Sequence, residues 1–142
     1  MSRIPTALAA ATILILALAG CGSSSSGSSS KALTKSQWTT KADAICKTYN
    51  AKTQALEPAA DATTADVDAA VRKVADLFVE EIGKIKKLKA PSSIASDVTA
   101  MLDSLNTAAT TLKTQGSAAL TGTPFADAGT KAQALGLKEC GA

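Results

Sequence analysis

Apolar side chains recur at helical spacing between residues 67 and 88, and this repeat constrains the fold more than any other feature of the sequence. Its members are three or four positions apart: Val67, Val71, Val74, Phe78, Ile82, Ile85 and Leu88. Such spacing places the side chains on one face of an α-helix, whereas a strand would require strict alternation. The sequence therefore predicts a long amphipathic helix at the centre of an all-α core.

The composition supports an all-α fold in a single small domain. Only 3% of the 142 residues are aromatic, while good helix formers such as alanine, leucine and lysine are abundant. The formal net charge of +3 is weak and interspersed along the chain. We therefore expect no nucleic-acid partner, because nucleic-acid-binding proteins carry concentrated basic patches.

A helix is predicted before the central one, from residue 35 to residue 56. Thr34 and Gln37 have the spacing of a capping box, and Pro58 follows the expected end. Cys46 is expected at the edge of its apolar stripe, which consists of Trp38, Ala42, Ile45, Tyr49 and Leu56.

The central helix is expected to begin at a cap formed by Thr63 or Thr64. Asp66 and Asp68 follow in its first turn, where acidic side chains complement the positive end of the helix dipole. A calcium site at this pair is disfavoured, because the glycine and the distal glutamate of known calcium loops are missing. We therefore predict no metal site.

Two more helices are predicted after Pro91. One is capped by Ser92 or Ser93 and ends near Gln115, with Gly116 as its left-handed terminator. Its stripe consists of Ile94, Val98, Met101, Leu102, Leu105, Ala109 and Leu112. Residues 116–122 are expected to form a loop with at most one helical turn. The last helix then starts with Thr123 as cap and Pro124 at its first position, and it ends at Gly136. Its inward residues are expected to be Phe125, Ala128, Ala132 and Leu135, with Leu137 packing after the helix. Four amphipathic helices with short connections predict a small antiparallel bundle over residues 34–142.

The first twenty residues are typical of a secretory signal. Arg3 precedes a short apolar run, and the sequence Leu18-Ala19-Gly20-Cys21 closes it. This closing sequence resembles the bacterial lipoprotein box. The resemblance implies cleavage between Gly20 and Cys21 and a diacylglyceryl group on the Cys21 sulfur. The alternatives are an uncleaved anchor or an ordinary secretory signal with a chance cysteine.

Residues 21–33 are expected to tether the domain to the outer face of the cell membrane. Residues 22–30 comprise seven serines and two glycines, a composition that behaves as a flexible coil. The membrane is then the first partner of this protein, through the lipid on Cys21. Two acyl chains hold a protein at a bilayer stably, whereas one does not.

Three cysteines occur in the chain, and an odd count in a secreted protein needs an explanation. If Cys21 carries lipid, then Cys46 and Cys140 remain and can pair. An extracytoplasmic location permits such a disulfide.

The mature part resembles a group of small lipoproteins from high-GC Gram-positive bacteria. The similarity lies in the A-D-A-I-C segment from Ala42 to Cys46, in Ala90-Pro91, and in the terminal G-L-x-x-C-G segment from Gly136 to Gly141. It implies a helical extracytoplasmic domain with a Cys46–Cys140 bridge, and it carries over no activity.

The sequence argues against an enzyme. It contains no histidine, which excludes Ser-His and Cys-His nucleophile pairs and the Glu-x-x-His di-metal sites of helical bundles. Glu80 and Glu81 are interpreted as solvated side chains in ion pairs with lysines such as Lys84. We expect no catalytic residues and no cofactor.

A non-catalytic binding, interaction or envelope-structural module is the favoured function. The partner would be an envelope protein or a cell-wall polymer. The lysines at 84, 86, 87 and 89 are interpreted as ordinary surface residues of a bundle, and the functional alternative is contact with anionic headgroups or wall polymers. The alternative is a carrier of small apolar ligands with a pocket inside the bundle. Trp38, Tyr49 and Phe78 are the candidate lining residues, although aromatic residues on such stripes usually belong to the core.

Overall fold

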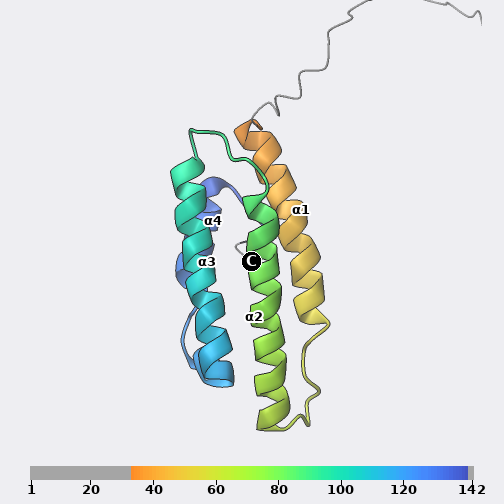
Figure 1. Cartoon of the computed structure of the whole chain (residues 1–142). Helices are drawn as coiled ribbons and strands as arrows, with labels where there is room; N and C mark the ends of the chain where they lie inside the picture. Colours follow the sequence, from red (N-terminus) through yellow and green to blue (C-terminus); the bar gives the residue numbers. More distant parts are fainter. Residues whose placement is uncertain (1–32, 141–142) are drawn as a thin grey trace, which may run out of the picture. The chain divides into compact units, whose positions relative to one another are not determined.

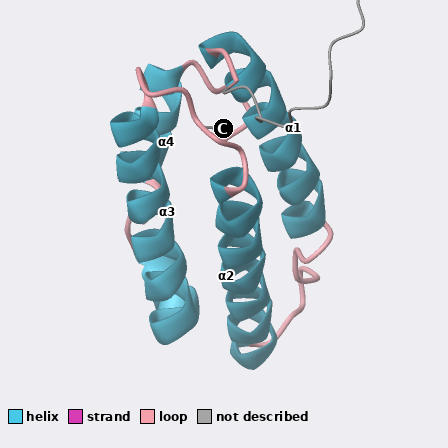
Figure 2. Ribbon diagram, turned by 45° about the horizontal axis from the view of Figure 1, so that its top comes forward, coloured by secondary structure: helices cyan, strands magenta, loops and turns pink. Residues whose placement is uncertain are grey.

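The structure is a computed structural model that describes residues 33–140, and it confirms the predicted all-α antiparallel bundle (Figures 1 and 2). Consecutive α-helices run in alternating directions. The helices are α1 (Lys35–Gln54), α2 (Thr64–Lys86), α3 (Ala95–Gln115) and α4 (Ala126–Leu135), with a 3₁₀-helix η1 (Gly116–Thr121) between the last two.

The α2 helix has the central position that its apolar repeat predicts. It packs against α1, α3 and η1, and α3 in turn packs against α4 and η1. The larger of two apolar clusters joins α1 to α4 through the following buried residues: Trp38, Ala42, Cys46, Ile82, Ile85, Ile94, Val98, Met101, Leu102, Ala132, Leu135 and Leu137. A smaller cluster centres on Val71, Ala75, Leu112 and Ala119.

The α1 helix begins with the predicted capping box. The Thr34 hydroxyl accepts a hydrogen bond from the Gln37 backbone N–H at 3.2 Å, and the Gln37 side chain accepts one from the Thr34 N–H at 3.0 Å. The prediction that Ile45 lies on the buried face of α1 and Cys46 at its edge is wrong by one position. Cys46 is 0% exposed, whereas Ile45 is half-buried, because the buried face follows residues 38, 42, 46 and 49.

The α2 helix is capped by Thr63, and its two early aspartates have different roles. Asp66 completes a capping box, accepting from the Thr63 N–H at 3.0 Å and from the Thr63 hydroxyl at 2.6 Å. Asp68 instead accepts a hydrogen bond from the Ser117 N–H at 2.7 Å. Asp68 thus fastens η1 to α2, a tertiary role that dipole complementation alone does not describe.

The predicted starts of two helices in the second half of the chain are wrong. The α3 helix starts after Ile94 without a side-chain cap, so neither Ser92 nor Ser93 has that role. The α4 helix likewise starts after Phe125, because Thr123 and Pro124 form a preceding turn in which the Ala126 N–H bonds to the Thr123 carbonyl.

The predicted loop after Gly116 is a 3₁₀-helix. Its small side chains allow a close approach to α2 and α3, and Ala119 is buried there. Both predicted glycine terminators adopt positive φ angles, 61° at Gly116 and 85° at Gly136. Gly136 has the left-handed helical conformation, whereas Gly116, with a ψ of −139°, does not have the predicted one. Leu137 is buried after Gly136, as the sequence predicts.

The predicted signal (1–20), its cleavage position at Gly20, the lipid-bearing Cys21 and nearly all of the tether (21–33) lie outside the described residues. Among residues 33–140, no helix combines the length and the apolar character that crossing a membrane requires.

Candidate ligand-binding site

A cavity of about 480 Å³ lies between the helices and the C-terminal segment. We call it the Glu81 cavity. Every α-helix contributes to its wall: α1 through Asn50, α2 through Phe78 and Glu81, α3 through Leu105, and α4 through a run of residues that includes Ala128. This volume falls within the range of about 300–1,000 Å³ that is usual for small-molecule sites.

Small side chains on α4 leave this space open. The helix presents Ala126, Ala128 and Gly129 to the cavity, and none of them reaches across to α2. The preceding turn brings Phe125 against Phe78, with ring centroids 4.6 Å apart. The two rings form an apolar part of the wall, beside the polar part that Asn50 and Glu81 provide.

Glu81 is the most unusual residue of the site. It is 3% exposed and is the one charged residue in the buried part of the described chain. No side chain or backbone group of residues 33–140 forms a hydrogen bond or ion pair with its carboxyl. Burial disfavours the charged form and raises the pKa of Glu81 from 4.5 to about 7.

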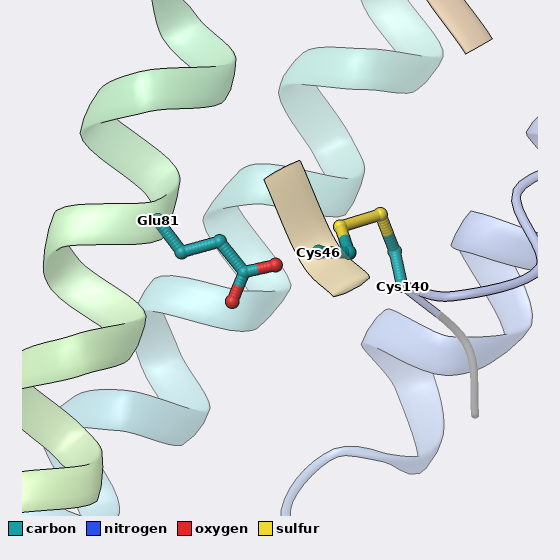
Figure 3. Close-up of side chains that lie close together, drawn as sticks. All are labelled: Cys46, Glu81 and Cys140. Atoms are coloured by element: carbon teal, nitrogen blue, oxygen red, sulfur yellow. A yellow bond between two sulfur atoms is a disulfide. The ribbon is translucent and has the colours of Figure 1, made fainter. Parts of the chain in front are cut away.

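The predicted Cys46–Cys140 disulfide is present and borders the site. The two Cα atoms are 5.1 Å apart, a normal separation for a disulfide. Figure 3 shows the Glu81 side chain reaching from α2 toward the two sulfur atoms. Cys140 lines the cavity, so the bridge holds one part of its wall in place.

Hydrogen bonds reinforce the position of this C-terminal segment. An Asp43 carboxylate oxygen on α1 accepts from the backbone N–H groups of Lys138 at 2.9 Å and Glu139 at 3.0 Å. The Asn50 side-chain amide donates to the Glu139 carbonyl at 2.9 Å. Together with the disulfide, these contacts attach the last described residues to α1.

The two sulfurs and a Glu81 carboxylate oxygen lie within 4.8 Å of one another. Such a triad has the ligand types of a zinc site, but the thiolate and not the disulfide is the metal ligand. In the oxidised protein the two sulfurs are neutral and bonded to each other. The triad therefore does not provide a metal site in this state.

The three aromatic residues proposed from sequence to line a pocket have different environments. Phe78 borders the Glu81 cavity. Trp38 is fully buried in the larger apolar cluster, and its indole N–H donates to the Leu88 carbonyl at 3.4 Å. Tyr49 is buried on α1, and its hydroxyl donates to the Glu80 carboxylate at 3.4 Å. Neither Trp38 nor Tyr49 is part of the cavity wall.

The sequence-based interpretation of Glu81 as a solvated ion-pair residue is wrong. Its position carries the signal that was missed: Phe78, Glu81 and Ile85 have i, i+3, i+7 spacing, which places all three on one face of α2. A carboxylate on a buried stripe marks a candidate functional position, because burying an unpaired charge is costly. Glu80, one residue earlier, is exposed as expected, but its carboxylate accepts from the Tyr49 hydroxyl, and the ion pairs of the described residues do not include one between Glu80 and Lys84.

Two further surface features bear on binding. The lysines at 84, 86, 87 and 89 are exposed at the end of α2 and beyond it. An apolar hollow of about 290 Å³ at the start of α2 is bordered by Leu56, Val67 and Leu120, and Leu120 is 53% exposed.

Comparisons of the chain with protein-family models, with curated proteins and with solved structures found no match. The function of the site therefore has to be inferred from its own geometry and chemistry.

Proposed function

We propose that this chain is a lipid-anchored extracytoplasmic lipoprotein whose helical domain binds a small ligand in the Glu81 cavity and catalyses no reaction. The single observation that carries the ligand-binding part is Glu81 on the wall of a 480 Å³ space: the residue is 3% exposed, and no group of residues 33–140 bonds to its carboxyl. A buried polar group normally has a hydrogen-bond partner. The Glu81 oxygens are accessible from the cavity, since no fully enclosed side-chain oxygen or nitrogen among the described residues lacks a partner. A ligand in the cavity therefore reaches them and supplies the partner that the described residues do not.

The residues around the cavity support the non-catalytic part of the proposal. The chain contains no histidine, and the cysteine that lines the cavity is oxidised. Burial raises the pKa of Glu81, on this wall, to about 7. Glu139, the other wall residue with a carboxyl side chain, is only half-buried. One buried carboxyl beside apolar side chains supports recognition of a ligand, whereas acid–base catalysis normally uses a second positioned group.

Three features of the sequence support the anchor part of the proposal: the segment Leu18-Ala19-Gly20-Cys21, the serine-rich tract that follows it, and the odd number of cysteines. Pairing of Cys46 with Cys140 leaves Cys21 as the remaining cysteine. A tethered domain of this kind would capture a small molecule at the outer face of the membrane. Contact with an envelope protein is the second candidate function, favoured by the apolar hollow beside the exposed Leu120.

Native mass spectrometry of the protein purified from its own membranes tests the ligand-binding proposal. Thr130 is exposed and borders the cavity, so a Thr130→Trp side chain would block the opening. Thr110→Trp is the matched control. Thr110 is also an exposed helical threonine whose hydroxyl donates to the carbonyl four residues earlier, but it is not part of the cavity wall.

We expect a small molecule to remain bound to the wild type and to Thr110→Trp and to be absent from Thr130→Trp. If all three proteins have only the mass of the lipidated polypeptide, the ligand-binding proposal is wrong and the protein-contact function gains support.

A further inference from the structure

We infer that the ligand of the Glu81 cavity is an organic ammonium ion: a protonated amine on an apolar body, with its N–H groups donating to the Glu81 carboxylate. This inference rests on the proposed function and specifies the chemical class of the ligand.

The charge of the cavity wall favours a cation. The wall includes two residues with carboxyl side chains, Glu81 and Glu139, and no lysine or arginine. A ligand carboxylate or phosphate would therefore meet like charge without a compensating cation, which costs binding free energy. An ammonium group instead neutralises the buried carboxylate on binding.

The hydrogen-bonding capacity of Glu81 sets a second requirement. An ionised carboxylate only accepts hydrogen bonds, and no described residue donates one to Glu81. Among the polar residues of the wall, Asn50 already donates its side-chain amide to the Glu139 carbonyl, and the Thr130 hydroxyl donates to the Ala126 carbonyl. The ligand therefore has to bring the donor, and a charged N–H donor forms a stronger bond to a carboxylate than a neutral hydroxyl does.

The remaining wall defines the rest of the molecule. Phe78 and Phe125 are in contact with each other, and Leu105 and Ala128 add aliphatic surface. These groups suit an apolar or aromatic body. A free polar cation such as a small inorganic ion would leave this apolar surface unused.

The pH dependence follows from the groups that surround Glu81. From α1 these are Tyr49, whose pKa is raised by its own burial and then by Glu80 and Glu81, and the amide of Asn50. The wall contributed by α3 and α4 carries no ionisable side chain, and the C-terminal segment adds Glu139. Because burial raises the pKa of Glu81 to about 7, the carboxyl is neutral at pH 5.5 and mostly ionised at pH 8. Ammonium binding should thus strengthen as the pH rises through this window.

Two probes of nearly equal size test the inference: 3-phenylpropylamine, which is protonated below pH 9, and the neutral 3-phenylpropan-1-ol. Each is titrated into the full mature lipoprotein, and binding is followed through the NMR signals of backbone amides at the cavity. The lipid-bearing protein is kept in solution by detergent, and a probe that only dissolves in the detergent leaves the signals of the cavity amides unchanged. At pH 8 we expect the amine to bind about tenfold or more tightly than the alcohol, and its affinity should fall about tenfold or more at pH 5.5.

The variants Glu81→Gln and Glu80→Gln complete the test. Glu81→Gln should abolish the preference for the amine and its pH dependence, whereas Glu80→Gln, at the exposed neighbouring position, should retain both. If the alcohol binds as tightly as the amine and Thr130→Trp abolishes binding of both, the ammonium inference is overturned while the proposed small-ligand site stands. If the amine moves no cavity signal, the inference is overturned, and absence of a co-purified molecule from the native protein would overturn the proposed function as well.

Discussion

Replacing Glu81 with glutamine should change how the stability of the domain depends on pH. The pKa of Glu81 is raised from 4.5 to about 7 in the folded protein, so between these values the folded state holds a proton that the unfolded state has released. Stability therefore falls as pH rises through this interval. At about 1.4 kcal/mol per pKa unit, the shift corresponds to a loss of about 3 kcal/mol by pH 8.

Glutamine cannot ionise, so Glu81→Gln should not lose this stability. The difference in free energy of unfolding between the variant and the wild type should shift by about 3 kcal/mol in favour of the variant from pH 4 to pH 8. Any constant cost of burying the amide cancels, because only the change with pH is compared. Urea unfolding at each pH, with the disulfide intact, measures the difference.

The assay has a convenient probe and a matched control. Trp38 is the sole tryptophan and is fully buried, so its fluorescence reports unfolding of the core. Glu80→Gln removes a carboxylate from the exposed adjacent position and keeps an oxygen that can accept from the Tyr49 hydroxyl. It should leave the pH dependence of the wild type in place. Parallel stability curves for the wild type and Glu81→Gln, within about 0.5 kcal/mol, would refute the buried, ionisable carboxyl.

Three further predictions concern the disulfide, a glycine and the anchor. Cys140→Ser should lower stability by about 4–5 kcal/mol in the chain-entropy model, because the bridge closes a loop with a sequence separation of 94 residues; a melting temperature equal to that of the wild type would contradict this. Gly116→Ala should cost about 1–3 kcal/mol, since φ is 61° and a Cβ would lie 2.7 Å from Asp68 Oδ1. That cost should shrink in an Asp68→Ala background, and equal costs by urea unfolding would exclude the clash. Cys21→Ser should release the protein from membranes or leave its precursor uncut, and unchanged membrane fractionation would count against the lipid.

The helices could be predicted from sequence because their signals are local. The spacing from Val67 to Leu88, the Thr34–Gln37 capping box and the glycines at 116 and 136 each act within a few residues of the chain. The structure confirms these features within the described residues, including positive φ at both glycines. The disulfide could also be predicted from sequence, because a lipid on Cys21 leaves Cys46 and Cys140 as the one possible pair.

The predictions that are wrong or incomplete concern residues where tertiary contacts outweigh local signals. Asp68 looks like a dipole-complementing residue from its position, yet it binds Ser117, 49 residues away. The small residues from 116 to 121 look like a loop, yet they form a 3₁₀-helix that packs between α2 and α3. No local rule identifies the distant element against which a segment packs.

The sequence by itself therefore determined the helical class, the order of the helices and the two cysteines available for a bridge. Only the tertiary structure decided that Glu81 is buried beside that bridge, on the wall of a cavity that Phe78, Phe125 and the small residues of α4 leave open. The physical reason is distance along the chain. Capping and periodicity depend on neighbours within one or two turns, whereas the cavity beside Glu81 is assembled from residues of all four helices and the C-terminal segment.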